Sequence, residues 1–179
     1  MADALVIVDF QNDFTSGGAL EVKGGDDIAA RVNELAADSR FELVVATRDW
    51  HPPNHGSFTE QGGIWPVHCV QGTEGAELHP SLDRAAVDIV LDGGQDPHTE
   101  GYSAFDGTNF GELLRERGID GMTVVGLATD YCVKHTALDA LREGFEVTVD
   151  ESAVRGVELE PGDSDRALDE VRAAGGTVA

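Results

Sequence analysis

Short apolar runs along the chain alternate with segments in which apolar residues recur every three or four positions. The runs are rich in β-branched residues and predict strands, whereas the longer spacing predicts amphipathic helices. We expect strands at 4–8, 43–47, 88–91, 122–126 and 146–149, with a last short strand ending at Thr177-Val178. We expect helices at 28–38, 110–116, 132–142 and 163–174.

This alternation predicts βαβ units, and the strands are apolar on both faces, as in a parallel sheet that helices cover on both sides. We therefore predict an α/β fold with three αβα layers and a doubly wound, mostly parallel sheet of five to six strands, in a single domain over residues 1–179. Ligands bind beyond the carboxyl ends of the strands in such a sheet. Polar residues follow several of the predicted strands, so we expect the site there.

The net charge of the chain limits the classes of molecule that it can bind. Asp and Glu number 34 against 12 Lys and Arg, a net charge of −22, and this negative field repels a phosphate backbone. We therefore expect no nucleic-acid partner. The acidic residues are scattered, as on a solvated surface; a high-salt cytoplasm and compositional drift are the two explanations for their excess.

The hydrophobic content of 41% and the charged content of 26% are typical of a soluble globular protein. No apolar run approaches the roughly 20 residues that span a bilayer, and no export leader opens the sequence. We expect no membrane association and a cytoplasmic location. Two cysteines are too few for a disulfide scaffold, so at least one is expected to be free for chemistry.

Cys132 and Asp9 are the candidates for nucleophilic chemistry. Cys132 lies at the start of a predicted helix, where the partial positive charge lowers a thiol pKa and free N–H groups can hold an oxyanion. The alternative is a small buried thiol, which is the expected role of Cys69. Asp9 ends an apolar strand, where a carboxylate is costly unless it is paired or exchanges a proton with a nearby thiol. Its alternative role is to cap a turn.

A carboxylate and three imidazoles follow the second predicted strand. Asp49 and His51 lie on one side of an extended strand end, Pro52-Pro53 turns the chain toward His55, and His68 can complete the set. These ligands suit one divalent ion, Zn²⁺ first and Fe²⁺ or Mn²⁺ as alternatives. The same spacing also occurs in hydrogen-bonded surface groups.

Aromatic residues are scarce, at 6% of the chain, yet several lie in the loops around these polar groups. Phe14 follows Asp9, and Trp65 comes three residues before His68. Both are placed to sandwich a flat ring above the metal.

Five ordered blocks resemble the nicotinamidase/pyrazinamidase family within the isochorismatase-like cysteine hydrolases. They are DFQNDF from Asp9, TRDWHPPNHGSF from Thr47, WPVHCVQGTEGA from Trp65, YSAF from Tyr102 and VGLATDYCV from Val125. The resemblance covers nearly the whole chain. The metal block separates this branch from metal-free relatives such as isochorismatase and carbamoylsarcosine amidase.

The resemblance implies hydrolysis of nicotinamide, or pyrazinamide, through a thioester on Cys132. It implies that Asp9 is the general acid and base, and that a cis peptide before Ala128 aims the Ala128 N–H at the carbonyl oxygen. The implied metal ligands are Asp49, His51, His55 and His68. The implied ring pocket is Phe14, Leu20, Trp65 and Tyr102. Relatives often self-associate, so a homo-oligomer is also implied.

One position departs from the family. Gly93 stands where the family has a catalytic lysine, which would hold Asp9 ionised and offset the thiolate. Its loss predicts attenuated catalysis, unless a water, a cation or an arginine from elsewhere fills the gap. The alternatives to an attenuated amidase are a nicotinamide-binding homologue that no longer turns over, and a hydrolase of another small amide or of an isochorismate-like ester.

Overall fold

The computed structural model describes all 179 residues, and its six strands form one parallel sheet in the order β3-β2-β1-β4-β5-β6. The strands are β1 (Ala2–Val8), β2 (Phe41–Asp49), β3 (Ile89–Gly93), β4 (Ile119–Leu127), β5 (Glu146–Arg155) and β6 (Thr177–Val178). The helices are α1 (Ala29–Ala36), α2 (Phe110–Glu116), α3 (Lys134–Arg142) and α4 (Asp163–Ala173). The predicted α/β architecture is confirmed.

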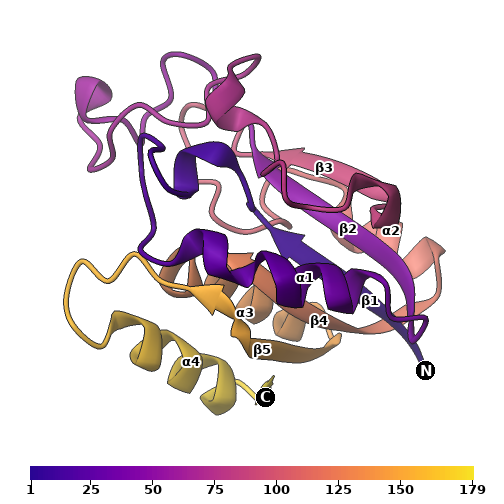
Figure 1. The fold of residues 1–179 in the computed structure, drawn as a ribbon. Coiled ribbons are helices and arrows are strands. Elements are labelled where there is room, and N and C mark those ends of the chain that lie inside the picture. The colour runs from indigo at the N-terminus through magenta and orange to yellow at the C-terminus, as the bar shows by residue number, and fades with distance from the viewer.

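Strand β1 explains why the sheet needs helices on both faces. Leu5 and Ile7 point into a core that α1 and the loops after β1 and β2 cover, while Val6 and Val8 point into a second core with α2, α3 and α4. Side chains alternate between the faces of a strand, and β1 is apolar from Ala4 to Val8, so this part of the strand is buried on both sides. Figure 1 shows α1 in front of the sheet and α3 behind it.

The sheet reverses its direction of winding at β1, which has β2 on one side and β4 on the other. Loops that leave neighbouring strands at such a point diverge and open a crevice at the carboxyl ends. Gly126 lets β4 approach the end of β1 closely, because a Cβ at this position would lie 2.1 Å from the Val8 carbonyl oxygen. The long segment between β2 and β3 gathers above this end of the sheet (Figure 1).

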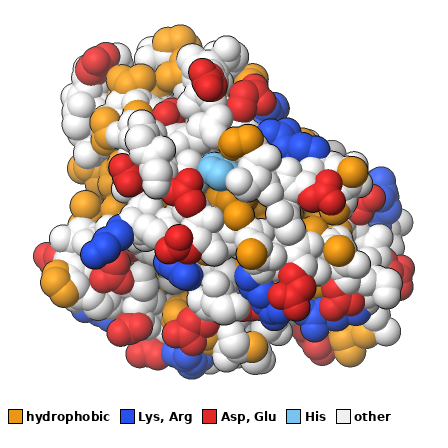
Figure 2. Space-filling view, in the orientation of Figure 1, with side chains coloured by type: hydrophobic (Ala, Val, Ile, Leu, Met, Phe, Trp, Pro, Cys, Tyr) orange, Lys and Arg blue, Asp and Glu red, His pale blue; other side chains and the backbone are white.

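The surface carries its acidic side chains in a scattered distribution, with basic side chains between them on the face that Figure 2 shows. None of the helices combines the length and the apolar character that a membrane crossing requires.

We expect the central strand to set the stability of the fold. Leu5→Ala removes a fully buried side chain and should lower the free energy of unfolding by about 2–5 kcal/mol, because it leaves a cavity in a close-packed core. Leu159→Ala is the matched control, since Leu159 is 59% exposed. Urea unfolding of both variants measures the difference, and equal losses would contradict this account of the core.

Candidate active site

Asp9 lies at the end of β1 with its carboxylate held between β2 and the start of the α3 region. The Thr47 hydroxyl donates a hydrogen bond of 2.7 Å to Asp9 Oδ1. The Cys132 thiol is close enough to donate to the same carboxylate. Asp9 and Cys132 are both buried, so the predicted pair of thiol and proton acceptor is brought together. The turn-capping role belongs to Asp13, which accepts hydrogen bonds from the Cys69 and Ala19 N–H groups.

Burial controls the protonation of this pair. Burial, together with the negative charge of Asp49, raises the pKa of Asp9 to about 8, and hydrogen bonds from Cys132 and Thr47 partly oppose this rise. Burial also raises the pKa of the Cys132 thiol well above its usual range, with Asp9 and Asp49 adding to the effect. The expectation of a lowered thiol pKa is therefore wrong, because desolvation and two neighbouring carboxylates disfavour the thiolate.

The helix around Cys132 also differs from the expected one. Residues Thr129–Val133 form a π-helical turn, and the regular helix α3 begins only at Lys134. The peptide bond between Leu127 and Ala128 is cis, as the family resemblance implies. Ala128 and Cys132 border one pocket.

Asp49, His51 and His68 form a buried group whose ligand atoms all lie within 4.8 Å of one another. His51 Nε2 is 3.3 Å from Asp49 Oδ2, and His68 Nε2 is 3.9 Å from the same oxygen. Asp49 ends β2, and the two histidines come from the loop that follows it. Three of the four predicted metal ligands are thus assembled around one point.

The other nitrogen of each ring explains why this group fits a metal. His51 Nδ1 lies 2.6 Å from the Gly94 carbonyl oxygen, and His68 Nδ1 lies 2.7 Å from the Pro66 carbonyl oxygen. A carbonyl accepts only, so each Nδ1 carries a hydrogen, and in the neutral ring Nε2 keeps its lone pair on the side of Asp49. Metal-ligating histidines are usually oriented by such a bond.

His55 lies next to this group without joining it. Its ring centroid is 3.9 Å from that of His51, and its Nδ1 is 2.7 Å from the Ser57 hydroxyl oxygen. Its Nε2 is buried and has no hydrogen-bond partner. Burial lowers the pKa of His55 to about 4, so the ring is neutral and its free nitrogen suits a cation.

Gln11 joins the two carboxylate-bearing strands. Its side-chain oxygen accepts from the Asp49 N–H at 2.9 Å, and its amide nitrogen donates to the carbonyls of Asp49 and Ala76, each at 2.8 Å. Sequence reasoning missed Gln11, because only the paired strands reveal this bridge. It also missed Thr47, although residues two apart on a strand point to the same side, which places Thr47 on the same side as Asp49.

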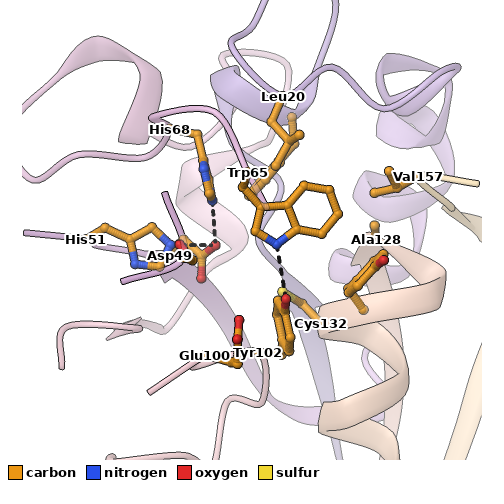
Figure 3. Close-up of a pocket in the computed structure, with 13 residues that line it drawn as sticks. Leu20, Asp49, His51, Trp65, His68, Glu100, Tyr102, Ala128, Cys132 and Val157 are labelled. Carbon is orange, nitrogen blue, oxygen red and sulfur yellow. Dashed lines mark hydrogen bonds and ion pairs between the residues drawn. The ribbon is translucent and has the colours of Figure 1, made fainter. Parts of the chain in front are cut away.

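An aromatic pocket is lined by both the metal-ligand group and Cys132 (Figure 3). Asp49 belongs to that group and also lies near the sulfur, because its carboxylate, that of Asp9 and the Cys132 Sγ are within 4.8 Å of one another. The pocket encloses about 400 Å³, including its open mouth. Trp65 Nε1 donates to the Tyr102 hydroxyl at 3.0 Å, which fixes one wall. All four predicted ring-pocket residues border it. The full lining is Phe14, Leu20, Asp49, His51, Ser57, Trp65, His68, Glu100, Tyr102, Ala128, Tyr131, Cys132 and Val157.

Four lining residues were not predicted: Ser57, Glu100, Tyr131 and Val157. Tyr131 precedes Cys132, and that adjacency was a usable signal. Val157 comes from the segment after β5, and Asp130 holds it by accepting a hydrogen bond of 2.9 Å from its N–H. Nothing in the local sequence around Val157 indicates this long-range contact.

Gly93 ends β3 in register with Asp49 and borders a small cavity beside Asp9. The cavity encloses about 230 Å³, and a Cβ at Gly93 would meet only the Thr108 methyl group, at 3.9 Å. A Cβ at this position therefore fits without a clash, beside a cavity that Asp9 also lines.

No arginine lies beside Asp9 to serve as the substitute considered for the family's lysine. Arg48, the nearest along β2, makes hydrogen bonds of 2.7 and 3.0 Å to the Asp92 carboxylate and lies over the Trp50 ring. Asp9 forms no ion pair with any lysine or arginine of the chain. Of the three substitutes considered for the lysine, the arginine is thus excluded.

Comparison with known proteins adds an independent line of evidence. The isochorismatase domain model matches residues 3–179. Nicotinamidase from Escherichia coli is 45% identical over 98% of this chain and 93% of its own length. The structure is similar to pyrazinamidase of Pyrococcus horikoshii in complex with zinc, with a TM-score of 0.91, 46% identity and coverage of 100% and 99% of the two chains. It is also similar to PnC1 from L. infantum in complex with nicotinate, with a TM-score of 0.94, 38% identity and coverage of 99% and 92%.

Loss of one predicted ligand should release a bound divalent ion. His68→Ala removes an Nε2 lone pair from the group and should lower the affinity for Zn²⁺ by at least about tenfold. His98→Ala, which changes an exposed histidine outside the pocket, is the control. Metal analysis after dialysis compares the two, and equal metal retention would refute the ligand role of His68.

Proposed function

The chain belongs to the isochorismatase family, and we propose that it is an amidase that hydrolyses nicotinamide to nicotinate and ammonia. The observation that carries the proposal is the single pocket that Cys132, aromatic side chains and the group formed by Asp49, His51 and His68 all line. The relatives named nicotinamidase and pyrazinamidase support the substrate class. Pyrazinamide, which carries the same carboxamide on a flat ring, is a second expected substrate.

In the proposed binding mode, Phe14 and Trp65 flank the ring, and the carboxamide points toward Cys132. Aromatic side chains contact a flat heteroaromatic ring with large area and little loss of freedom. Leu20 and Tyr102 complete the pocket walls. The pyridine nitrogen then faces the metal-ligand group.

Asp9 is the proposed proton carrier of the reaction. In its ionised form it takes the Cys132 proton, and the sulfur attacks the amide carbon. The N–H groups of Ala128 and Cys132 are the proposed donors to the resulting oxyanion. Asp9 then returns the proton to the departing ammonia, and accepts another from the water that cleaves the thioester.

We further propose that Asp49, His51 and His68, with His55 as the fourth ligand, hold one divalent ion. Zn²⁺ is the first choice because the P. horikoshii relative is in complex with zinc, and Fe²⁺ and Mn²⁺ suit the same donors. Such an ion would supply a Lewis acid on the ring side of the pocket.

A second candidate function follows from Gly93. The pocket and the metal-ligand group are intact, yet Asp9 has no cationic partner and a pKa of about 8. A protein with this site can bind nicotinamide and turn it over slowly or not at all. Attenuated turnover is therefore part of the proposal, and a binding protein is its limiting case.

Removal of the proposed nucleophile should abolish the reaction. Cys132→Ala is expected to release no ammonia from nicotinamide, because no other thiol faces the pocket, while its metal content stays unchanged. Cys69→Ala removes the other free cysteine, which does not line the pocket, and should keep the parental rate. Ammonia release measures both variants. Turnover by Cys132→Ala would overturn the assignment of the nucleophile.

Restoring a cation beside Asp9 should raise turnover. Burial raises the pKa of Asp9 to about 8, so the parent protein should lose activity as the pH falls below this value and Asp9 becomes protonated. Gly93→Lys supplies an ammonium group that favours the ionised carboxylate, so the acid limb of the pH–rate profile should move to lower pH.

Gly93→Ala is the control for this variant, since it fills space without adding charge. The expected result is a higher rate at pH 7 for Gly93→Lys alone. If neither the parent nor Gly93→Lys releases ammonia while both bind nicotinamide, the chain is a binding protein. Equal profiles in all three chains would contradict the role given to Gly93.

A further inference from the structure

Glu100 is the one acidic side chain on the pocket wall outside the metal-ligand group. It lies beside Tyr102 at the mouth, on the side of Asp49 (Figure 3). Its negative charge contributes to the raised pKa of Tyr102, for which burial is the main cause, and it also acts on His55. Glu100 is therefore close to both ends of the site while remaining exposed to solvent.

The charge of Glu100 is not neutralised by the chain. It forms no ion pair with any lysine, arginine or histidine. The lining of the pocket contains no lysine or arginine at all. An anion in the pocket thus meets an unpaired carboxylate at the mouth and no cationic side chain.

The backbone holds Glu100 in this place. Gly101, the next residue, has a φ of +68° and packs so closely on Gly94 that a Cβ would lie 2.7 Å from the Gly94 Cα. Gly94 in turn accepts the hydrogen bond from the ring of His51. This chain of contacts ties the backbone next to Glu100 to the metal-ligand group, so Glu100 starts from a fixed point on the pocket wall.

We propose that Glu100 is a specificity-determining residue that discriminates against anionic ring carboxylates in favour of uncharged ring carboxamides. The inference rests on the proposed function, in which an uncharged amide becomes a carboxylate inside this pocket. The Glu100 carboxylate repels the anionic product and not the uncharged substrate. It therefore lowers the affinity for nicotinate and promotes product release. It also disfavours anionic substrates, which separates this pocket from one built for isochorismate-like compounds.

The test compares binding of nicotinate and nicotinamide to chains that carry Cys132→Ala, so that no turnover interferes. Each chain is brought to the same Zn²⁺ content, and intrinsic tryptophan fluorescence reports the two Kd values. Glu100→Gln should lower the ratio of the nicotinate Kd to the nicotinamide Kd by about three- to tenfold at low salt, and by less at high salt. Glu100→Asp keeps the charge and should keep the ratio of the parent.

Glu60→Gln is the matched control, because it removes one negative charge from an exposed residue that does not line the pocket. The proposal would be overturned if Glu100→Gln left the ratio of the two Kd values unchanged. If nicotinate binding is below detection both with Glu100 and with Glu100→Gln, the ratio counts as unchanged. An equal change in Glu60→Gln would also overturn the proposal, by assigning the effect to net charge. Ammonia release by the chain with Cys132 intact is a separate measurement, so a failure of the amidase proposal remains distinguishable.

Discussion

The burial of two carboxylates at the carboxyl ends of β1 and β2 is the constraint on which the site depends. Asp9 and Asp49 are both nearly inaccessible, and an ionised carboxylate loses its hydration energy when it leaves water. The fold meets this cost differently for each. Asp49 faces two imidazole nitrogens that can share a cation with it, whereas Asp9 has only a hydroxyl and a thiol. One carboxylate is thus suited to hold a charge, and the other to exchange a proton.

This division follows from the sheet. Parallel strands end at the same edge, and residues two apart on β2 face the same side, so Thr47 and Asp49 both reach toward the end of β1. Gln11 then fixes the spacing of the two strand ends through its three hydrogen bonds. The histidine rings are oriented by backbone carbonyls rather than by charged groups, so their tautomers are set before any ligand enters.

The sequence predicted the sheet well because each strand is a short apolar run bounded by turns, and those runs have few other stable arrangements. It also indicated Asp9, Asp49, His51 and His68, since ligand-type residues follow strands. The thiol pKa could not be predicted in this way. A helix start stabilises a thiolate, but burial and nearby carboxylates oppose it, and their balance depends on three-dimensional distances. The place of Val157 in the pocket wall could not be predicted either, because it depends on packing between segments that are far apart in the sequence.

The absence of a cation at position 93 gives the site a consistent electrostatic character. Asp9 and Asp49 lie beside the sulfur of Cys132, Glu100 lines the same pocket, and no lysine or arginine lines it. Such a site disfavours both the thiolate that begins the reaction and the carboxylate that ends it. In the proposed reaction, the first effect would slow attack and the second would speed release, so the lack of a cation beside Asp9 and the unpaired Glu100 would act on opposite ends of the cycle. Gly93 and Asp9 line one small cavity, and a Cβ at Gly93 meets no close neighbour, so position 93 is the point at which a cation can be set against Asp9.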